Sequence, residues 1–144
     1  MIIDSHCHLN YEPMSLSLRE TIKRANNDGV KYLLTISTED KSFEKILKII
    51  QEFKCVYGTY GIHPHEAKNH NKIKAEDIIK KVKSDKKIIG IGESGLDFYY
   101  NHSDKNDQIK CFEEHISAAQ ELQMPIIVHT RNAENETLEI IKKK

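Results

Sequence analysis

The residues best suited to chemistry in this sequence are histidines and acidic side chains in short, closely spaced groups. His6 and His8 stand two positions apart in the run DSHCH, and Asp4 precedes them. Side chains at i and i+2 of a strand point to the same face, roughly 6.6 Å apart along the strand. Two imidazoles at this spacing can bind one metal ion. Asp4 could orient one of these ligands without binding the metal itself. The alternative is a pair of polar residues in a loop after a short strand.

Three further residues follow apolar runs typical of buried strands. Glu93 comes directly after KIIGIG, and His129 and Arg131 follow PIIV. A carboxylate at the end of an apolar strand is costly to desolvate unless it is paired or bound to metal. A histidine in the same position on the next strand adds a nitrogen ligand, and the planar guanidinium of Arg131 suits phosphate. The alternatives are a solvated or ion-paired carboxylate, a satisfied buried histidine and a surface arginine.

Two other motif residues have weaker assignments. His63 stands in GIHPH before a proline, which restrains the backbone of the preceding residue. It is predicted to contact substrate rather than metal. Asp97, at the end of GESGLD, is expected to support the site or to remain a loop carboxylate. Cys7 points away from its neighbouring histidines and is predicted to be a small, buried apolar side chain.

The elements that position these residues alternate between strand and helix. Runs of strand-forming residues predict strands at 1–3, 30–36, 56–62, 87–91 and 125–128, and helical spacing predicts helices near 17–29, 43–50, 78–82, 107–123 and 135–143. Repeated βα units imply a parallel sheet, because right-handed crossovers through helices join parallel strands. The polar groups then meet at the carboxyl edge of the sheet, where such folds build their sites. An open doubly wound sheet and a (β/α)₈ barrel both fit this pattern.

Composition limits the remaining possibilities. The 144 residues suffice for one domain, covering 1–144, and a net charge of +0 gives no overall basic field for nucleic acid or membranes. Three cysteines without a CxxC pair argue against a disulfide framework and fit a reducing compartment. No apolar run reaches the ~20 residues of a membrane span, and the N-terminus lacks a secretory pattern. We therefore expect a cytoplasmic protein with no membrane partner.

The motifs DSHCH, GIHPH, GESGLDF and HTR, in this order, resemble the TatD family of metal-dependent deoxyribonucleases and hydrolases over essentially the whole chain. The resemblance implies a (β/α)₈ barrel of the TIM type, truncated here to about five βα units. It also implies one or two divalent cations, Mg, Mn or Zn, at the strand ends. The site residues that it implies are His6 and His8 for one metal, Glu93 as the catalytic, metal-bridging carboxylate, His129 for a second metal, His63 and Arg131 near the substrate phosphate, and Asp4 and Asp97 behind the ligands.

The resemblance favours cleavage of phosphodiester bonds of DNA by metal-activated water, at ends or on single strands. A barrel of this type usually needs about 250 residues, and the family's later histidine and aspartate ligands have no counterparts in this sequence. Two alternatives stay open: an inactive family fragment that at most binds metal, and a barrel hydrolase acting on another ester or amide. Five strands leave two sheet edges, so self-association or a complementary C-terminal fragment is also expected.

Overall fold

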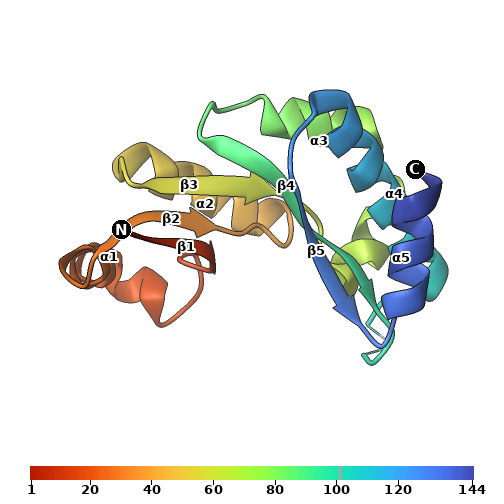
Figure 1. The fold of residues 1–144 in the computed structure, drawn as a ribbon, viewed down its shortest axis with the longest axis horizontal. Helices are drawn as coiled ribbons and strands as arrows, with labels where there is room; N and C mark the ends of the chain where they lie inside the picture. Colours follow the sequence, from red (N-terminus) through yellow and green to blue (C-terminus); the bar gives the residue numbers. More distant parts are fainter. Residues whose placement is uncertain (101) are drawn as a thin grey trace.

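The computed structural model describes residues 1–100 and 102–144, and its elements alternate between strand and helix as the sequence predicts (Figure 1). Two short 3₁₀ segments, η1 and η2, also occur and were not expected from the sequence. The elements are, in chain order, β1 (Ile2–Cys7), η1 (Met14–Ser17), α1 (Leu18–Asn27), β2 (Val30–Thr35), α2 (Asp40–Glu52), β3 (Val56–Tyr60), η2 (Pro64–His70), α3 (Ala75–Val82), β4 (Ile88–Asp97), α4 (Lys105–Leu122), β5 (Ile126–Arg131) and α5 (Glu134–Lys143).

The strands form one parallel sheet in the order β1-β2-β3-β4-β5. Each new strand joins the same growing edge, whereas a doubly wound sheet reverses its strand order part-way along the chain. This order is therefore that of a barrel, and the sheet is five strands of a TIM-type barrel with β1 and β5 at its edges. In Figure 1, α1 and α2 lie beside β1 to β3, and α3, α4 and α5 gather beside β4 and β5.

Apolar helix faces and the strands beneath them form the core. The spacing that predicted α2 is confirmed, because Phe43, Ile46 and Ile50 are all buried against the sheet. A second cluster joins Leu96 of β4 to Phe112 of α4 and to residues of α5. Burial of these faces holds the helices on the outside of the sheet and leaves the strand ends free to carry polar residues.

Strands β4 and β5 extend further than the sequence predicted. Parallel pairing continues through Gly95 beside His129 to Asp97 beside Arg131, so β4 ends at Asp97 rather than at residue 91. Glu93 and His129 therefore lie within strands and not after them. The same holds for β1, which runs to Cys7 and includes His6.

Two glycines make this extension possible. Gly92 and Gly95 both have positive φ, at 124° and 147°. A Cβ at Gly95 would meet the carbonyl oxygen of His129 at 2.0 Å, and one at Gly92 would meet the carbonyl oxygen of Ile127 at 2.5 Å. Only glycine allows β4 and β5 to approach this closely on either side of Glu93. Both glycines thus let the two main chains pass close to each other beside Glu93.

Several large apolar side chains remain exposed on the sheet. Ile2, Ile3, Tyr32 and Ile89 belong to β1, β2 and β4, and roughly half of each side chain is accessible to solvent. Among the described residues, the helices are either too short or too polar to cross a membrane.

Candidate metal centre

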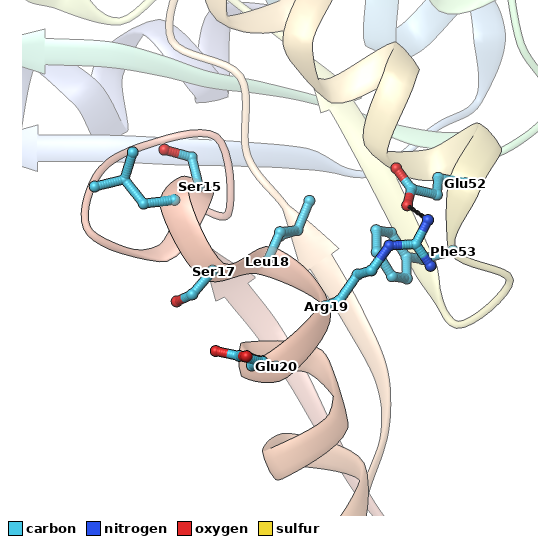
Figure 2. A pocket seen from close by; sticks show the side chains of 8 residues that line it. Ser15, Ser17, Leu18, Arg19, Glu20, Glu52 and Phe53 are labelled. Carbon is cyan, nitrogen blue, oxygen red and sulfur yellow. Dashed lines mark ion pairs between the residues drawn. The ribbon is translucent and has the colours of Figure 1, made fainter.

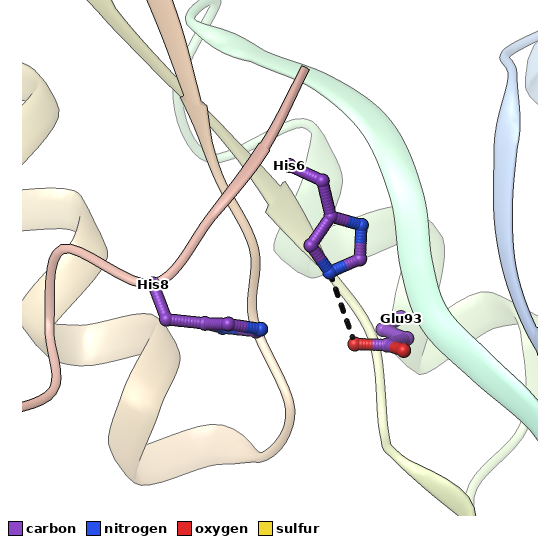
Figure 3. Close-up of side chains that lie close together, drawn as sticks. All are labelled: His6, His8 and Glu93. Carbon is purple, nitrogen blue, oxygen red and sulfur yellow. Dashed lines mark ion pairs between the residues drawn. The ribbon is translucent and has the colours of Figure 1, made fainter. Parts of the chain in front are cut away.

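The two histidines of the first motif converge with Glu93 at the carboxyl ends of β1 and β4 (Figure 3). One ligand atom from each of His6, His8 and Glu93 can be chosen so that all three lie within 4.8 Å of one another. The His6 Nε2 atom lies 3.5 Å from Oε2 of Glu93. This is the convergence that the i, i+2 spacing predicts. We call these three residues the first group.

Within the first group, a hydrogen bond fixes the ring of His8, whereas the side chain of His6 is partly exposed. The Nδ1 atom of His8 lies 3.2 Å from the carbonyl oxygen of Ile36, which can only accept a hydrogen bond. Nδ1 therefore carries the proton and Nε2 keeps a free lone pair for a metal. The side chain of His6 is 42% exposed. Asp4 accepts a hydrogen bond from the backbone N–H of His6 at 3.1 Å, so it contacts the main chain of that ligand and not an imidazole.

A second group shares Glu93 and adds His63 and His129, again with ligand atoms within 4.8 Å of one another. The Nδ1 atom of His129 lies 3.1 Å from Oε1 of Glu93 and 3.2 Å from Nε2 of His63. Glu93 thus belongs to both groups, one oxygen facing His6 and the other facing His129. A carboxylate in this position is suited to bridge two cations.

The atoms of the second group also fit a cation on chemical grounds. His129 donates from Nε2 to Oδ2 of Asp97 at 3.1 Å, so in the neutral ring Nδ1 carries a lone pair. That lone pair faces the carboxylate oxygen of Glu93, and two acceptors at 3.1 Å need a proton or a cation between them. The hydrogen bond to Glu93 accordingly raises the pKa of His129. Burial would raise the pKa of Glu93, but His129, His63 and His6 together lower it.

Asp97 supports the second group from a fully buried position. Its Oδ2 accepts hydrogen bonds from His65 at 2.8 Å and from His129 at 3.1 Å, while Oδ1 accepts from the backbone N–H groups of Tyr99 and Tyr100. Burial alone would raise the pKa of this carboxyl, but the four hydrogen bonds outweigh burial and lower it to about 2. Asp97 thus contacts one histidine of the second group, and its role in supporting a metal ligand stays a prediction.

In its neutral form, His63 presents an N–H at Nε2. Its Nδ1 accepts a hydrogen bond from the backbone N–H of His65 at 3.2 Å, so the proton of the neutral ring lies on Nε2. Burial, followed by the neighbouring His129, lowers the pKa of His63 to about 4, which keeps the ring neutral near pH 7. The N–H at Nε2 then faces Nδ1 of His129, 3.2 Å away. The substrate contact that the sequence suggested for His63 stays a prediction.

Three supporting residues were missed from the sequence. Gln108 is buried on α4 and grips the main chain of Asp97, accepting from its N–H at 2.8 Å and donating to its carbonyl at 3.1 Å. His115 is fully buried and accepts from the N–H of Ile62, next to His63, at 3.1 Å. His65 belonged to the motif GIHPH, but its partner Asp97 lies 32 residues away. The sequence around a polar residue on a helix does not indicate which distant residue its side chain will hydrogen-bond.

The remaining predicted residues lie at the margins. Arg131 ends β5 with an exposed side chain, and its Cζ atom lies 5.2 Å from the centre of the Tyr100 ring. Cys7 is half-buried, its thiol lies 3.3 Å from the carbonyl of Leu34, and burial raises its pKa to about 12. It packs against the core as a small apolar residue, as predicted.

A hollow of about 310 Å³ adjoins the two groups, and polar side chains line most of it. A larger hollow of about 450 Å³ lies elsewhere, between α1 and the end of α2, where Arg19 pairs with Glu52 (Figure 2). It contains none of the residues of the two groups. The residues that line the hollow beside the groups are His8, Tyr11, Thr38, Glu39, His63, His65, Glu66 and Glu93.

The fold and the site together define a class: barrel proteins with histidine and carboxylate side chains gathered at the carboxyl ends of their strands. The family model described as "TatD related DNase" matches residues 3–144. The chain belongs to this family, as its motifs suggested.

Relatives agree with this assignment. An uncharacterised metal-dependent hydrolase of Buchnera aphidicola (strain Bp) is 37% identical over 99% of this chain and 54% of its own length. YabD of Bacillus subtilis, named in the same way, is 32% identical over 100% of this chain and 56% of its own. The 3'-5' ssDNA/RNA exonuclease TatD of Citrobacter koseri is 31% identical over 85% and 47%. This chain thus spans about half the length of the curated relatives it matches.

A solved structure confirms the fold. The crystal structure of YjjV, a TatD homologue from Escherichia coli, superposes with a TM-score of 0.85 over 99% of this chain and 55% of that chain, at 23% identity. The five βα units therefore correspond to somewhat more than half of a TatD-type barrel.

Proposed function

We propose that this chain carries the metal centre of a hydrolase that cleaves phosphodiester bonds of DNA, at ends or on single strands. The observation that carries the proposal is the sharing of Glu93 between two groups of histidines at the strand ends. When bound, divalent cations at such a centre polarise a phosphoryl oxygen and lower the pKa of a water molecule. The donor set of imidazole nitrogens and a carboxylate suits Zn, Mn or Mg to different degrees, and the groups provide for one or two ions.

The chain's own residues fit a phosphate in this place. The Nε2–H of His63 lies beside Nδ1 of His129, and it could donate to a phosphate oxygen when that nitrogen binds a cation instead. Arg131 contributes a guanidinium at the end of β5, and a planar fork of donors matches two phosphate oxygens. The C. koseri relative is named for action on single-stranded nucleic acid, which supports an unpaired strand as substrate.

The experiment measures cleavage of a labelled single-stranded oligonucleotide by the purified chain with Mn²⁺, Mg²⁺ or Zn²⁺, and with EDTA. We expect slow cleavage that depends on the metal and that Glu93→Gln abolishes. Glu121→Gln, which changes an exposed carboxylate on α4, serves as the matched control and keeps the wild-type rate. Metal binding without turnover would instead favour a metal-binding family fragment. Turnover of a simple carboxyl ester or amide, with no cleavage of DNA, would favour another hydrolase of this class.

A protein partner belongs to the same proposal. Strands β1 and β5 are sheet edges, and edges with exposed apolar side chains such as Ile2 and Ile3 template pairing with further strands. We propose that these edges pair with a second copy of the chain or with a complementary C-terminal fragment. Sedimentation of the purified chain tests this, and a monomer at all concentrations, unchanged by the added fragment, would contradict it.

The cellular compartment is also part of the proposal. Cys7, Cys55 and Cys111 are free thiols, and Cys111 is buried. Free cysteines of this kind fit a reducing compartment, so we place the activity in the cytoplasm. Fractionation of cells that express a tagged chain would check this.

A further inference from the structure

The loop after β4 carries three consecutive aromatic residues that behave differently. Phe98 packs against the second core cluster, and the ammonium of Lys105 lies 4.3 Å from the centre of its ring. Tyr99 and Tyr100 remain 58% and 41% exposed. Packing therefore explains the first aromatic residue of the run and does not explain the other two.

Tyr100 is the centre of a group of flat side chains at the surface. The ring of His102 stacks on it with centroids 5.6 Å apart and an angle of 26° between the planes. The guanidinium carbon of Arg131 lies 5.2 Å from the centre of the same ring. We call Tyr100, His102 and Arg131 the stacking cluster. Its members are exposed, so the cluster can accept a further flat group.

The stacking cluster is held in place from both of its ends. The N–H of Tyr100 donates to Oδ1 of Asp97 at 3.0 Å. After His102, the hydroxyl of Ser103 donates to the carbonyl of His65 at 2.8 Å, and its carbonyl accepts from Gln108 at 2.9 Å. These hydrogen bonds hold the main chain at Tyr100 and at Ser103 before any ligand arrives. Preorganisation of this kind raises affinity, because little conformational freedom is lost on binding.

The stacking cluster adjoins the second metal-binding group. The ring of His65 lies 4.6 Å from that of His102 and 6.3 Å from that of His129, centroid to centroid. Asp97 is hydrogen-bonded both to His129 in the group and to the N–H of Tyr100 in the cluster. The stacking cluster therefore lies close enough to the metal centre for one nucleotide to place its phosphate at the centre and its base on the cluster.

We propose that the stacking cluster binds the nucleobase of an unpaired nucleotide whose phosphate lies at the metal centre, with Tyr100 and His102 stacking on the base and Arg131 contacting phosphate. The inference rests on the proposed function for the position of the phosphate. Aromatic stacking accepts any base, because every base has a π-face, so the cluster would select unpaired strands without reading sequence. A paired base is already stacked within its duplex and is not available to the cluster.

The test compares two fluorescent single strands of equal length, an oligothymidylate and its abasic counterpart, by anisotropy in EDTA at low salt. These strands carry the same phosphates and differ only in bases. We expect the wild-type chain to bind oligothymidylate more tightly. Tyr100→Ala should weaken that binding about 5- to 100-fold, the range for loss of one stacked base, and leave abasic binding unchanged. Tyr100→Phe keeps the ring and should keep the affinity.

Two further variants separate stacking from charge and from folding. Arg131→Gln should weaken both strands alike, because it removes a phosphate contact. Tyr32→Ala removes an exposed tyrosine from β2, away from the loop, and should change neither affinity. Near-UV circular dichroism checks that each variant is folded. If Tyr100→Ala does not fold, His102→Ala removes the other ring of the stacking cluster and should likewise weaken the binding of oligothymidylate.

Equal binding of the two strands by the wild-type chain, or an equal loss on both strands in Tyr100→Ala, would overturn the inference. Base-dependent binding without metal-dependent cleavage would support the stacking cluster and contradict the proposed hydrolysis. Cleavage that proceeds equally on strands with and without bases would support the hydrolysis and contradict the cluster.

Discussion

The two groups that share Glu93 are supported very differently by the rest of the molecule. In the first group, His8 has one carbonyl behind it and His6 is partly exposed on an edge strand. In the second, the buried carboxylate of Asp97 holds His129 through a hydrogen bond, and the main chain of His65 fixes the proton of His63. The number of hydrogen bonds that support the candidate ligands therefore rises from β1 toward β4 and β5.

This difference has a chemical consequence. Side chains fixed by buried hydrogen bonds keep their geometry in the absence of an ion, whereas exposed side chains must be ordered when the ion binds. The side chains of the second group are thus prearranged, whereas the exposed side chain of His6 in the first group would have to be ordered when an ion binds. We expect tighter binding at the second group, with the first filling at higher metal concentration.

The largest expected effect comes from removing the support of the second group. Asp97→Asn replaces two acceptor oxygens by one and removes a buried charge that four donors surround. Breaking such a buried arrangement costs about 3–5 kcal/mol in the free energy of unfolding. The affinity for metal should also fall, by the 10–100-fold that is typical when a ligand's partner is lost. Urea denaturation and calorimetry with Mn²⁺ measure both quantities.

Asp4→Asn is the matched change at the first group. Within the described part of the chain, the one hydrogen bond of the Asp4 side chain is to the backbone N–H of His6, so the free energy of unfolding should change by no more than about 0.5 kcal/mol. If Asp97→Asn and Asp4→Asn lower the free energy of unfolding by the same amount, the contrast between the two groups is wrong.

The second prediction concerns the stability of the folded chain in acid. It depends on His115, a buried histidine that accepts a hydrogen bond from Ile62, the residue before His63. Burial lowers the pKa of His115 from 6.5 to about 4 in the folded chain, although the hydrogen bond from its Nδ1–H to the carbonyl of Cys111 acts in the opposite direction. The unfolded chain therefore binds this proton at a higher pH. The neutral ring contributes its full stability above pH 6.5, and this is lost as the pH falls toward 4, by on the order of 3 kcal/mol.

His115→Gln removes this titrating group, so its free energy of unfolding should depend less on pH between 6.5 and 4. Denaturation in EDTA at several pH values measures the slope. His63, whose pKa is also lowered to about 4, keeps part of the slope in the variant. An unchanged slope would show that His115 does not couple acid to the loop that carries His63.

The third prediction compares the loss of the shared carboxylate, Glu93, with the loss of the two histidines of the first group. Glu93→Gln removes a ligand from both groups, so calorimetry with Zn²⁺ or Mn²⁺ should show a loss of about 100-fold or more, at the upper end of the range for a supporting residue. His6→Ala/His8→Ala should remove only the weaker event and leave the binding at the second group. Equal loss in the two variants would mean that one ion uses all of these side chains together.

The sequence predicts the first group more readily than the second, for a physical reason. An i, i+2 pair is local, so the alternation of a strand brings His6 and His8 together without any tertiary information. The pairs between His65 and Asp97 and between Gln108 and Asp97 join residues that are far apart in the chain. Only the packing of η2 and α4 against β4 creates them.

The bounds of the strands show the same limit. The parallel order of β1 to β5 follows from the βα repeat, and the barrel arrangement followed from the family motifs. The end of β4 did not, because Gly92 and Gly95 interrupt the run of strand-forming residues. In the folded chain they continue the strand, since the main chain of β5 lies where a side chain would otherwise be. Their role is visible only once the neighbouring strand is in place.

The smallest expected effect lies at the hollow between α1 and α2, which has the volume of a ligand site but none of the chemistry of the two groups. Arg19→Ala breaks the exposed pair with Glu52, in which the side chains are 78% and 44% accessible, and it removes the guanidinium from the ring of Phe53. Exposed pairs contribute about 0–1 kcal/mol and are screened by salt, so the loss should be small and should disappear at high ionic strength. Urea denaturation at two salt concentrations checks this, while metal affinity should stay at the wild-type value. A change in metal binding in this variant would mean that the hollow and the strand ends are coupled, and that support for the metal centre extends to α1.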